Sequence, residues 1–405
     1  MASPPLADHP AAPPTPAQTE AWLAADLRAR PVRLGRLRER MASERIDVYF
    51  GVSRENTRYL SGFVLGEGEE KVAGVSGQFL VSPRELVVLA DSRYTLQTRD
   101  ECPGARIEQV YNDFAQRWPE IVSSLGPARR VALEAGFVSH ATWQRLAAAA
   151  PGLELIPVEG WIEEQRQTKE PTELERVAAA CAVADGALER LLPVIRAGVT
   201  ETELALQLEW EMRTHGAEAL AFDVTCLAGE RAALPHGSAG SRVLHAGEVL
   251  LFDFGAQVAG YRSDMTRTLF VGEPNARDAE LYQLVAQAQE AAFAALTSAA
   301  ETGQHPTNRA VDAAAREVIA AAGHGDHFGH GLGHGIGLAT HEAPSLGRLA
   351  PESPLPSPTV FSVEPGVYLD DETGVRIEDL VLFDPLAGRV ERLTRFPREV
   401  TVVGE

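Results

Sequence analysis

Leu250-Leu251-Phe252-Asp253-Phe254-Gly255, followed by Tyr261-Arg262-Ser263-Asp264-Met265-Thr266, is the most informative segment of this chain. Each apolar run carries one aspartate, and Gly260 lies near the turn between them. If the runs pair as a hairpin centred near Val258, Asp253 and Asp264 lie opposite each other, with Cβ atoms about 5 Å apart. Two carboxylates on an apolar face repel and are costly to bury, so a cation between them is expected. The alternative is a pair of aspartates at strand ends that face water.

A second pair of apolar runs repeats this design. Glu364, in Phe361-Ser362-Val363-Glu364-Pro365-Gly366, precedes Glu378, in Val375-Arg376-Ile377-Glu378-Asp379, and residues 370–373 form the expected turn. The same hairpin argument places Glu364 opposite Glu378.

Histidines are dense between these two hairpins. Of the eleven in the chain, five fall within eighteen residues: His324, His327, His330, His334 and His341. The centre of this segment, residues 330–337, reads HGLGHGIG, and its glycines let the backbone approach a ligand closely. This composition predicts metal binding, with a flexible Gly/His loop as the alternative.

Four carboxylates and one imidazole form an oxygen-rich donor set, which suits Mn²⁺ or Co²⁺ better than a structural Cys-rich zinc site does. Two such ions, about 3.5–4 Å apart, can deprotonate one water for hydrolysis of a carbonyl or phosphoryl centre. The sequence has no GxxxxGK[ST] phosphate loop, so an amide substrate is favoured. Neither GxGxxG nor HExxH is present.

Composition narrows the class of protein. A net charge of -20 without a Lys/Arg block argues against nucleic-acid binding. Cys102, Cys181 and Cys226 are far apart and are expected to be reduced thiols. No apolar run reaches the ~20 residues needed to cross a bilayer, and we see no secretory signal, so we expect a cytoplasmic protein without membrane association.

The 405 residues predict two domains after a tail. We expect a disordered tail at residues 1–20, an amino-terminal domain at 21–165 and a catalytic domain at 166–405. In the amino-terminal domain, short apolar runs alternate with helical periods, which predicts an α/β layer. Its expected helices cover 34–46, 111–124 and 141–150, and its expected strands cover 48–50, 86–89, 131–133 and 153–156.

The catalytic domain combines helices with strand pairs, which predicts an α+β fold with an antiparallel sheet. Thr200 and Glu203 fit a capping box at the start of one helix. The other expected helices cover 172–195, 276–300 and 307–322, and the expected strands cover 222–227, 249–255, 261–271, 360–364 and 375–383.

Together these residues resemble the creatinase/methionine aminopeptidase, or "pita-bread", superfamily, and specifically its proline peptidases. Lys169-Glu170-Pro171-Thr172-Glu173-Leu174-Glu175 is similar to the start of the family's catalytic domain. Residues 56–63 (NTRYLSGF) and 91–94 (DSRY) are similar to a creatinase-type amino-terminal domain. The resemblance implies an α/β creatinase-like domain followed by an α+β pita-bread domain with a curved antiparallel sheet.

The resemblance also implies two divalent metal ions, Mn²⁺ first, with Co²⁺ or Zn²⁺ as alternatives. The implied metal ligands are Asp253, Asp264, His334, Glu364 and Glu378. Asp264 and Glu378 would bridge the ions, Asp253 would complete one site, and His334 and Glu364 would complete the other.

Further residues have implied catalytic roles. His236 would contact the substrate, His341 would hold the scissile carbonyl or the proline side, and His330 would line the proline pocket. Arg376 would support the ligands, and Glu364 would pass a proton to the proline nitrogen. His245, His324 and His327 match no family motif and are expected to be surface or supporting residues.

The implied function is an Xaa-Pro aminopeptidase, acting on peptides with proline at the second position. An Xaa-Pro dipeptidase, or prolidase, shares every ligand and remains an alternative. A methionine aminopeptidase would not need the amino-terminal domain, and creatinase-type members lack the metal set. A non-enzymatic binding protein on the same fold is the alternative of a different class. The family implies a homodimer or homotetramer.

Overall fold

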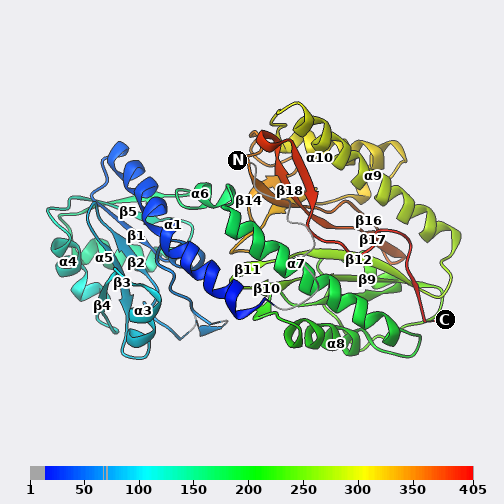
Figure 1. Ribbon diagram of the computed structural model, residues 1–405, viewed down its shortest axis with the longest axis horizontal. Coiled ribbons are helices and arrows are strands. Elements are labelled where there is room, and N and C mark those ends of the chain that lie inside the picture. The colour runs from blue at the N-terminus through cyan, green and yellow to red at the C-terminus, as the bar shows by residue number, and fades with distance from the viewer. Residues whose placement is uncertain (1–13, 67, 70–71, 405) are drawn as a thin grey trace. The chain divides into compact units, whose positions relative to one another are not determined.

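The computed structural model describes residues 14–66, 68–69 and 72–404 (Figure 1). Its internal contacts define an amino-terminal unit, Glu20–Gln165, and a catalytic unit that begins at Arg166. The tail expected at residues 1–20 lies outside the described residues as far as residue 13. Helix α1 begins at Pro16, so the expectation of disorder is wrong for residues 16–20.

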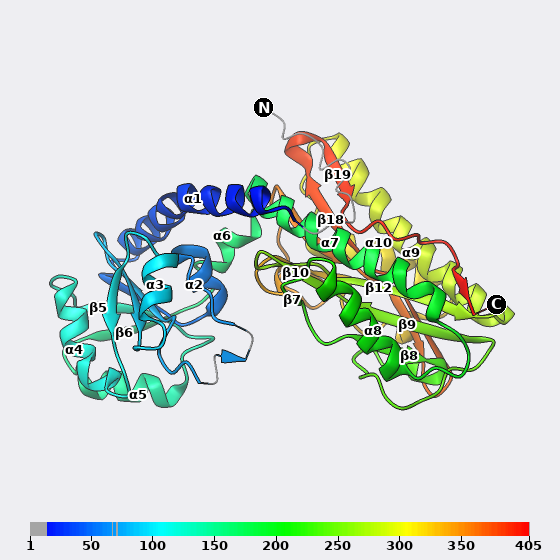
Figure 2. The same ribbon diagram turned by 60° about the horizontal axis from the view of Figure 1, so that its bottom comes forward.

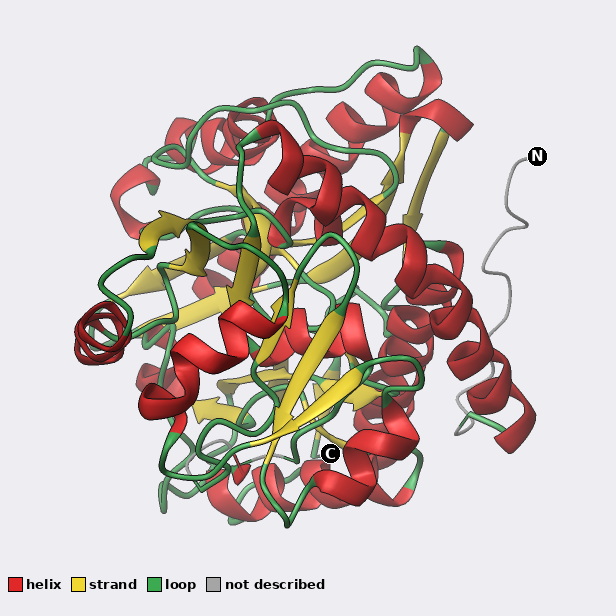
Figure 3. Ribbon diagram, turned by 90° about the vertical axis from the view of Figure 1, so that its left-hand side faces the viewer, coloured by secondary structure: helices red, strands yellow, loops and turns green. Residues whose placement is uncertain are grey.

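The amino-terminal unit contains one mixed sheet with strand order β4-β3-β2-β1-β5-β6. Strand β5 pairs in parallel with β1 and with β6, and β3 pairs in parallel with β4. Strand β2 is antiparallel to both of its neighbours, β1 and β3. Figure 3 distinguishes helices (red) from strands (yellow). Its helices are α1 (Pro16–Ser43), α2 (Arg54–Ser61), α3 (Thr95–Glu101), α4 (Phe114–Ser124), α5 (His140–Ala149) and α6 (Glu163–Gln167). Its strands are β1 (Val48–Gly51), β2 (Phe79–Val81), β3 (Leu86–Ala90), β4 (Arg106–Gln109), β5 (Arg130–Glu134) and β6 (Glu154–Val158).

Both faces of this sheet are covered, which explains why its central strands are continuous apolar runs. Val48 and Phe50 join a core that includes Trp118 of α4 and Leu146 of α5. Tyr49 points to the other face, where its ring lies 5.9 Å from that of Trp161. The α/β architecture expected for this part of the chain is therefore confirmed.

The catalytic unit is α+β, as expected. Its helices are α7 (Pro171–Leu191), α8 (Glu201–Thr214), α9 (Ala276–Glu301) and α10 (Asn308–Ala321). Its strands are β7 (Ala219–Leu220), β8 (Thr225–Ala228), β9 (Glu248–Phe254), β10 (Ala256–Val258), β11 (Tyr261–Arg262), β12 (Met265–Val271), β13 (Gly333–Gly335), β14 (Glu342–Leu346), β15 (Thr359–Val363), β16 (Gly366–Leu369), β17 (Thr373–Arg376), β18 (Asp379–Asp384), β19 (Arg389–Arg392) and β20 (Val402–Val403).

The strands form short sheets ordered β20-β12-β9-β8, β14-β13-β15-β18-β19, β11-β10-β7 and β16-β17. Pairing is antiparallel except between β12 and β20. Helices α7 and α8 pack on β7, β8, β10 and β11, whereas α9 and α10 pack on the strands from β14 to β19. Figure 2 shows β9 and β12 between these two helical layers. The sheet that contains β9 and β12 and the sheet that contains β15 and β18 therefore contribute to one hydrophobic core.

Local sequence signals fix the ends of the helices around this interior. The Thr200 hydroxyl accepts from the Glu203 N–H, and the Glu203 carboxylate accepts from the Thr200 N–H, which confirms the predicted capping box. Helix α7 ends at Leu191 instead of Ile195, because Pro193 follows in a short 3-10 turn.

Candidate metal centre

The hairpin β9–β12 carries Asp253 and Asp264, but in a register that differs from the expected one. Asp253 pairs with Thr266, and Val258 pairs with Tyr261. The predicted opposition of Asp253 and Asp264 is therefore wrong by two residues. The reason is a two-residue turn at Ala259 and Gly260, both with positive φ, which centres the hairpin one residue later. Because side chains alternate with a period of two, the shift leaves both aspartates on one face.

The second pair of carboxylates adopts the expected register. Val363 pairs with Asp379 on one side, and Gly366 pairs with Arg376 on the other, so Glu364 faces Glu378 between them. The Glu378 N–H donates to the Thr266 carbonyl, 3.1 Å away, which brings this hairpin alongside the first.

Strand β13 brings His334 to the same place. A Cβ atom on Gly333 would lie 1.9 Å from the Ser362 carbonyl oxygen, so only glycine allows this close approach of the two strands. The His334 N–H donates to the Ser362 hydroxyl (3.0 Å), which donates to Glu364 Oε1 (2.9 Å). The His334 Nδ1–H donates to the Gly335 carbonyl (3.1 Å), which leaves Nε2 as a free electron-pair donor.

The five predicted ligands converge. His334 Nε2 lies 3.6 Å from Asp264 Oδ2 and 3.5 Å from Glu364 Oε1. Asp264, His334 and Glu378 offer ligand atoms that all lie within 4.8 Å of one another. Asp253 is linked to this group by Arg376, whose guanidinium donates to Asp253 Oδ2. This is the oxygen-rich donor set with one imidazole that the sequence predicts.

The electrostatics of the cluster fit bound cations. Burial raises the pKa of Asp264 and of Glu378 well above the ordinary range, and the neighbouring carboxylates raise both further. Burial raises the pKa of Glu364 as well. Asp253 Oδ1 and Glu378 Oε1 are buried without a hydrogen-bond partner among the residues that the structure describes. Unpaired buried carboxylate oxygens are costly, and metal coordination would satisfy them.

Arg376 connects ligands on both hairpins. Its guanidinium donates to Asp253 Oδ2 (2.5 Å), to the Tyr368 hydroxyl (3.0 Å) and to Thr266 Oγ1 (2.9 Å). Thr266 in turn donates to Glu378 Oε2 (2.7 Å). Although burial alone would lower the pKa of Arg376, Tyr368 and the surrounding carboxylates raise it, so the guanidinium stays charged. Arg376 thus orients carboxylates from both hairpins.

Every candidate site residue lines one cavity of about 640 Å³ in the catalytic unit, a volume that accommodates a short peptide. The cavity is lined by the five predicted ligands together with His236, His330, His341 and Arg376. Burial lowers the pKa of His330 and of His341, which favours their neutral forms.

These histidines hold defined positions. The His341 ring lies 4.1 Å from that of His334. His330 donates from Nδ1 to the Gly331 carbonyl (2.7 Å) and accepts at Nε2 from the Tyr368 hydroxyl (2.8 Å). His245, His324 and His327 are not among the residues that line the cavity, and the Nδ1 atoms of His324 and His327 lie 3.1 Å apart.

Several residues of the site carry no obvious signal in the sequence. Thr266, Ser362 and Tyr368 each join a ligand or a histidine to its support, yet hydroxyl residues in strands are common. Lys169 and Glu342 form a buried ion pair (2.8 Å) beside His341. Lys169 lies in the segment that resembles the start of the family's catalytic domain, and Glu342 directly follows His341. A charged residue in or beside such a segment is the signal that could have found them.

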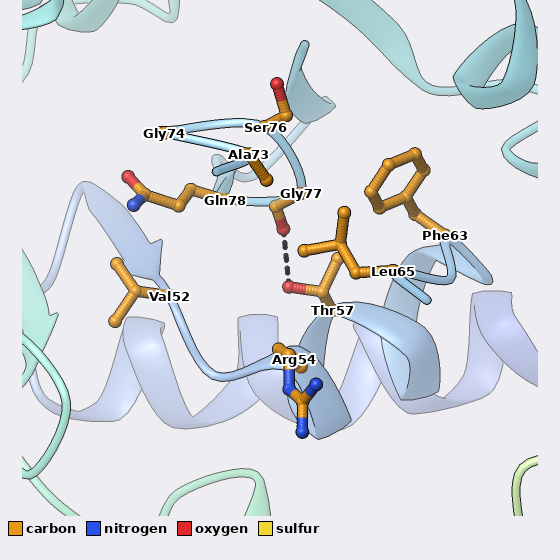
Figure 4. Close-up of a pocket in the computed structure, with 10 residues that line it drawn as sticks. All are labelled: Val52, Arg54, Thr57, Phe63, Leu65, Ala73, Gly74, Ser76, Gly77 and Gln78. Atoms are coloured by element: carbon orange, nitrogen blue, oxygen red, sulfur yellow. Dashed lines mark hydrogen bonds between the residues drawn. The ribbon is translucent and has the colours of Figure 1, made fainter. Parts of the chain in front are cut away.

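A smaller cavity, of about 120 Å³, lies in the amino-terminal unit (Figure 4). Thr57 lines it and donates to the Gly77 carbonyl (2.6 Å), and Arg54 supplies its one charged side chain among the described lining residues. Its described lining contains neither a carboxylate nor a histidine. This cavity therefore offers no comparable metal site.

Two further findings concern the cysteines and the helices. The three cysteines are free, as expected, and all three are buried. Among the described residues, no helix combines the length and the apolar character needed to cross a membrane.

Comparison with known proteins agrees with this geometry. An Xaa-Pro dipeptidase of Pyrococcus furiosus is 35% identical over 70% of this chain and 79% of its own. The structure of an Xaa-Pro dipeptidase from Bacillus anthracis superimposes with a TM-score of 0.82 at 32% identity, covering 92% of this chain and 100% of that one. The structure of an X-Pro aminopeptidase from Thermotoga maritima gives 0.80 at 34% identity, covering 91% and 99%.

Family comparison assigns both halves of the chain. Residues 33–168 match the creatinase/prolidase N-terminal domain, and residues 175–385 match metallopeptidase family M24. These matches confirm the creatinase-like domain and the pita-bread catalytic domain expected from the sequence. The chain therefore belongs to metallopeptidase family M24 and is a peptidase, a hydrolase of the divalent-metal-dependent kind.

Proposed function

We propose that this protein is an Xaa-Pro aminopeptidase, which removes the residue in front of a proline from the amino terminus of a peptide. The observation that carries the proposal is the convergence of four carboxylates and one imidazole, with unsatisfied buried oxygens, in a cavity of peptide size. A non-enzymatic binding protein on this fold would not need such a donor set.

Asp253, Asp264, His334, Glu364 and Glu378 would hold two divalent ions. The raised pKa values of Asp264 and Glu378 support this role, because each lies in the field of the other carboxylates. The predominance of oxygen donors favours Mn²⁺ over Zn²⁺, with Co²⁺ as a further candidate. When bound, the pair of ions would supply an activated water and polarise the scissile carbonyl.

The protein's own side chains would then orient the peptide and move the proton. His341 and His236, which line the cavity, would lie beside the scissile carbonyl oxygen, where donors stabilise developing negative charge. Glu364, whose pKa is raised by burial, can carry a proton to the departing proline nitrogen. Arg376 keeps Asp253 in place throughout.

The choice between aminopeptidase and dipeptidase depends on how the cavity treats a carboxylate. In an Xaa-Pro dipeptide, the proline carries a free carboxylate, which a dipeptidase must pair with a cation. Among the described residues that line the cavity, Arg376 is the one lysine or arginine, and it already serves Asp253, Tyr368 and Thr266. This arrangement favours peptides that continue beyond proline.

An Xaa-Pro dipeptidase is the second candidate. It is supported by the relatives from Pyrococcus furiosus and Bacillus anthracis, which carry that name. The cytoplasmic location proposed for the chain is supported by its free, buried cysteines. The homodimer or homotetramer stays a prediction.

The test compares an Xaa-Pro dipeptide with an Xaa-Pro-Xaa tripeptide, using metal-stripped protein before and after addition of Mn²⁺ or Co²⁺. We expect metal-dependent release of the first residue from the tripeptide. Cleavage of the dipeptide alone would establish the dipeptidase instead. Cleavage of neither peptide by metal-loaded protein would contradict the proposed substrate class.

A further inference from the structure

A buried cluster of three charges lies next to His341 in the catalytic unit. Glu342 follows His341 in the chain, and its Oε1 accepts from Lys169 Nζ at 2.8 Å. Its Oε2 forms an ion pair with Arg166. Lys169 Nζ also donates to the Arg166 carbonyl (2.6 Å). The side chains of Arg166, Lys169 and Glu342 are only 5%, 1% and 6% exposed.

The Glu342 carboxylate supports the loop that joins His334 to His341. Glu342 pairs with Gly335 across strands β14 and β13, next to His334. A Cβ atom on Gly337 would lie 2.5 Å from Glu342 Oε1 and 3.3 Å from Lys169 Cε, so the loop backbone rests on this ion pair. The loop therefore has little freedom to move while the pair is intact.

Hydrogen bonds to other segments hold the same loop as well. The Arg262 N–H donates to the Gly337 carbonyl (3.0 Å). The Arg262 guanidinium donates to the Thr340 hydroxyl (2.9 Å), which itself donates to the Ala221 carbonyl (3.0 Å). The segment immediately before His341 is thus fixed at several points, and Glu342, the residue immediately after His341, is fixed by its ion pairs.

Stability alone gives no reason for three charges at this place. Desolvation makes buried ion pairs weak contributors to stability, and well-packed apolar residues often replace them without loss. None of the three residues is among those that line the cavity. A geometric role explains their placement, because an ion pair with two fixed partners holds its backbone in one orientation.

We propose that Glu342, clamped by Lys169 and Arg166, is a positioning residue that holds His341 against the scissile peptide group. This inference rests on the proposed function, in which His341 contacts the substrate. Displacement of a catalytic group by about 1 Å can cost on the order of 100-fold in rate. Loosening the clamp should therefore slow turnover without loss of metal.

The experiment is a double-mutant cycle on the full-length, metal-loaded protein. The variants are Glu342→Gln, His341→Ala and the two combined, assayed for kcat and KM on the Xaa-Pro-Xaa tripeptide. Metal content and Tm are measured for each. Glu134→Gln is the matched control, since Glu134 is also a buried, hydrogen-bonded glutamate but lies in the amino-terminal unit.

If Glu342 acts through His341, Glu342→Gln lowers kcat by about 10- to 100-fold and keeps both metals. The double variant is then no slower than His341→Ala, because the lost interaction is the same one. Multiplicative losses, or normal kcat in Glu342→Gln, would overturn the inference. Failure of the proposed function looks different: the unaltered protein itself would not cleave the tripeptide.

Glu342→Gln leaves Lys169 and Arg166 without their carboxylate, and this could prevent folding. Lys169→Met is the second variant, since it keeps the Arg166–Glu342 pair intact. We expect a smaller loss of kcat, which again disappears in the His341→Ala background. An equal loss in both backgrounds would contradict the positioning role.

Discussion

Replacement of Glu378 by glutamine should stabilise the metal-free protein while abolishing its response to metal. Glu378, Asp264 and His334 place ligand atoms within 4.8 Å of one another, and Glu378 Oε1 has no partner among the described residues. In the variant, the amide oxygen can still accept from Thr266, and the new NH₂ group can donate toward the remaining carboxylates. One buried negative charge is removed at no cost in hydrogen bonds.

The size of the effect follows from Coulomb's law. Two unit charges at the 4.8 Å limit repel by about 3.5 kcal/mol at an effective dielectric constant of about 20. Since the raised pKa values of both carboxyls relieve part of this repulsion by protonation, we expect a gain of about 1–3 kcal/mol at neutral pH. Each kcal/mol of added stability raises Tm by roughly 2–4 °C.

The assay is thermal unfolding of EDTA-treated protein, with and without Mn²⁺. The unaltered protein should gain about 2.7 kcal/mol at a metal concentration 100-fold above Kd, whereas the Glu378→Gln variant should gain little and show no peptidase activity. A metal-free variant less stable than the metal-free parent would refute the electrostatic argument.

The matched control is Glu201→Gln, the same change at another buried glutamate of the catalytic unit. The Glu201 carboxylate accepts from the Ala228 and Gly240 N–H groups and from Arg231, so its charge is well compensated. This variant should lose about 1–3 kcal/mol in the metal-free state. If both variants shift Tm in the same direction, the like-charge cluster has no special effect.

Three further changes test other parts of the structure. Gly333→Ala should destabilise the catalytic unit by at least about 2 kcal/mol and lower metal affinity, because its Cβ would lie 1.9 Å from the Ser362 carbonyl oxygen; calorimetry and metal titration check this. Arg376→Met should weaken metal binding by about 10- to 100-fold, since Asp253 loses its orienting donor, and unchanged affinity in a metal titration would count against this role. Burial raises the pKa of Glu134 to about 7, so its protonation favours the folded state at low pH, and this contribution is lost as the pH rises through about 7. The free energy of unfolding should therefore fall between pH 5 and 8 in the unaltered protein, and this fall should be smaller by up to about 3 kcal/mol in Glu134→Gln. Urea unfolding at each pH measures the difference.

In the hairpin of Asp253 and Asp264, the sequence predicts the face that carries the two carboxylates but not the register of the strands. The apolar runs and the face of the carboxylates were predictable, because alternation depends only on local geometry. The register was not, because it depends on which two residues form the turn, and the left-handed conformation of Ala259 is unusual for alanine. The register of the Glu364–Glu378 pair was predictable, because its turn lies at the consecutive acidic residues Asp370, Asp371 and Glu372.

The two-domain α/β and α+β organisation, the donor set and the histidine-rich segment can be predicted from the sequence, because each depends on residue type and spacing. The side chains that support the donor set are known only from the folded structure. Arg376 reaches Asp253 across 123 positions of the chain, and Lys169 reaches Glu342 across 173. Such contacts leave no periodic trace in the sequence. They arise where strands and loops from distant segments pack together, and packing, unlike alternation or capping, is a property of the whole fold.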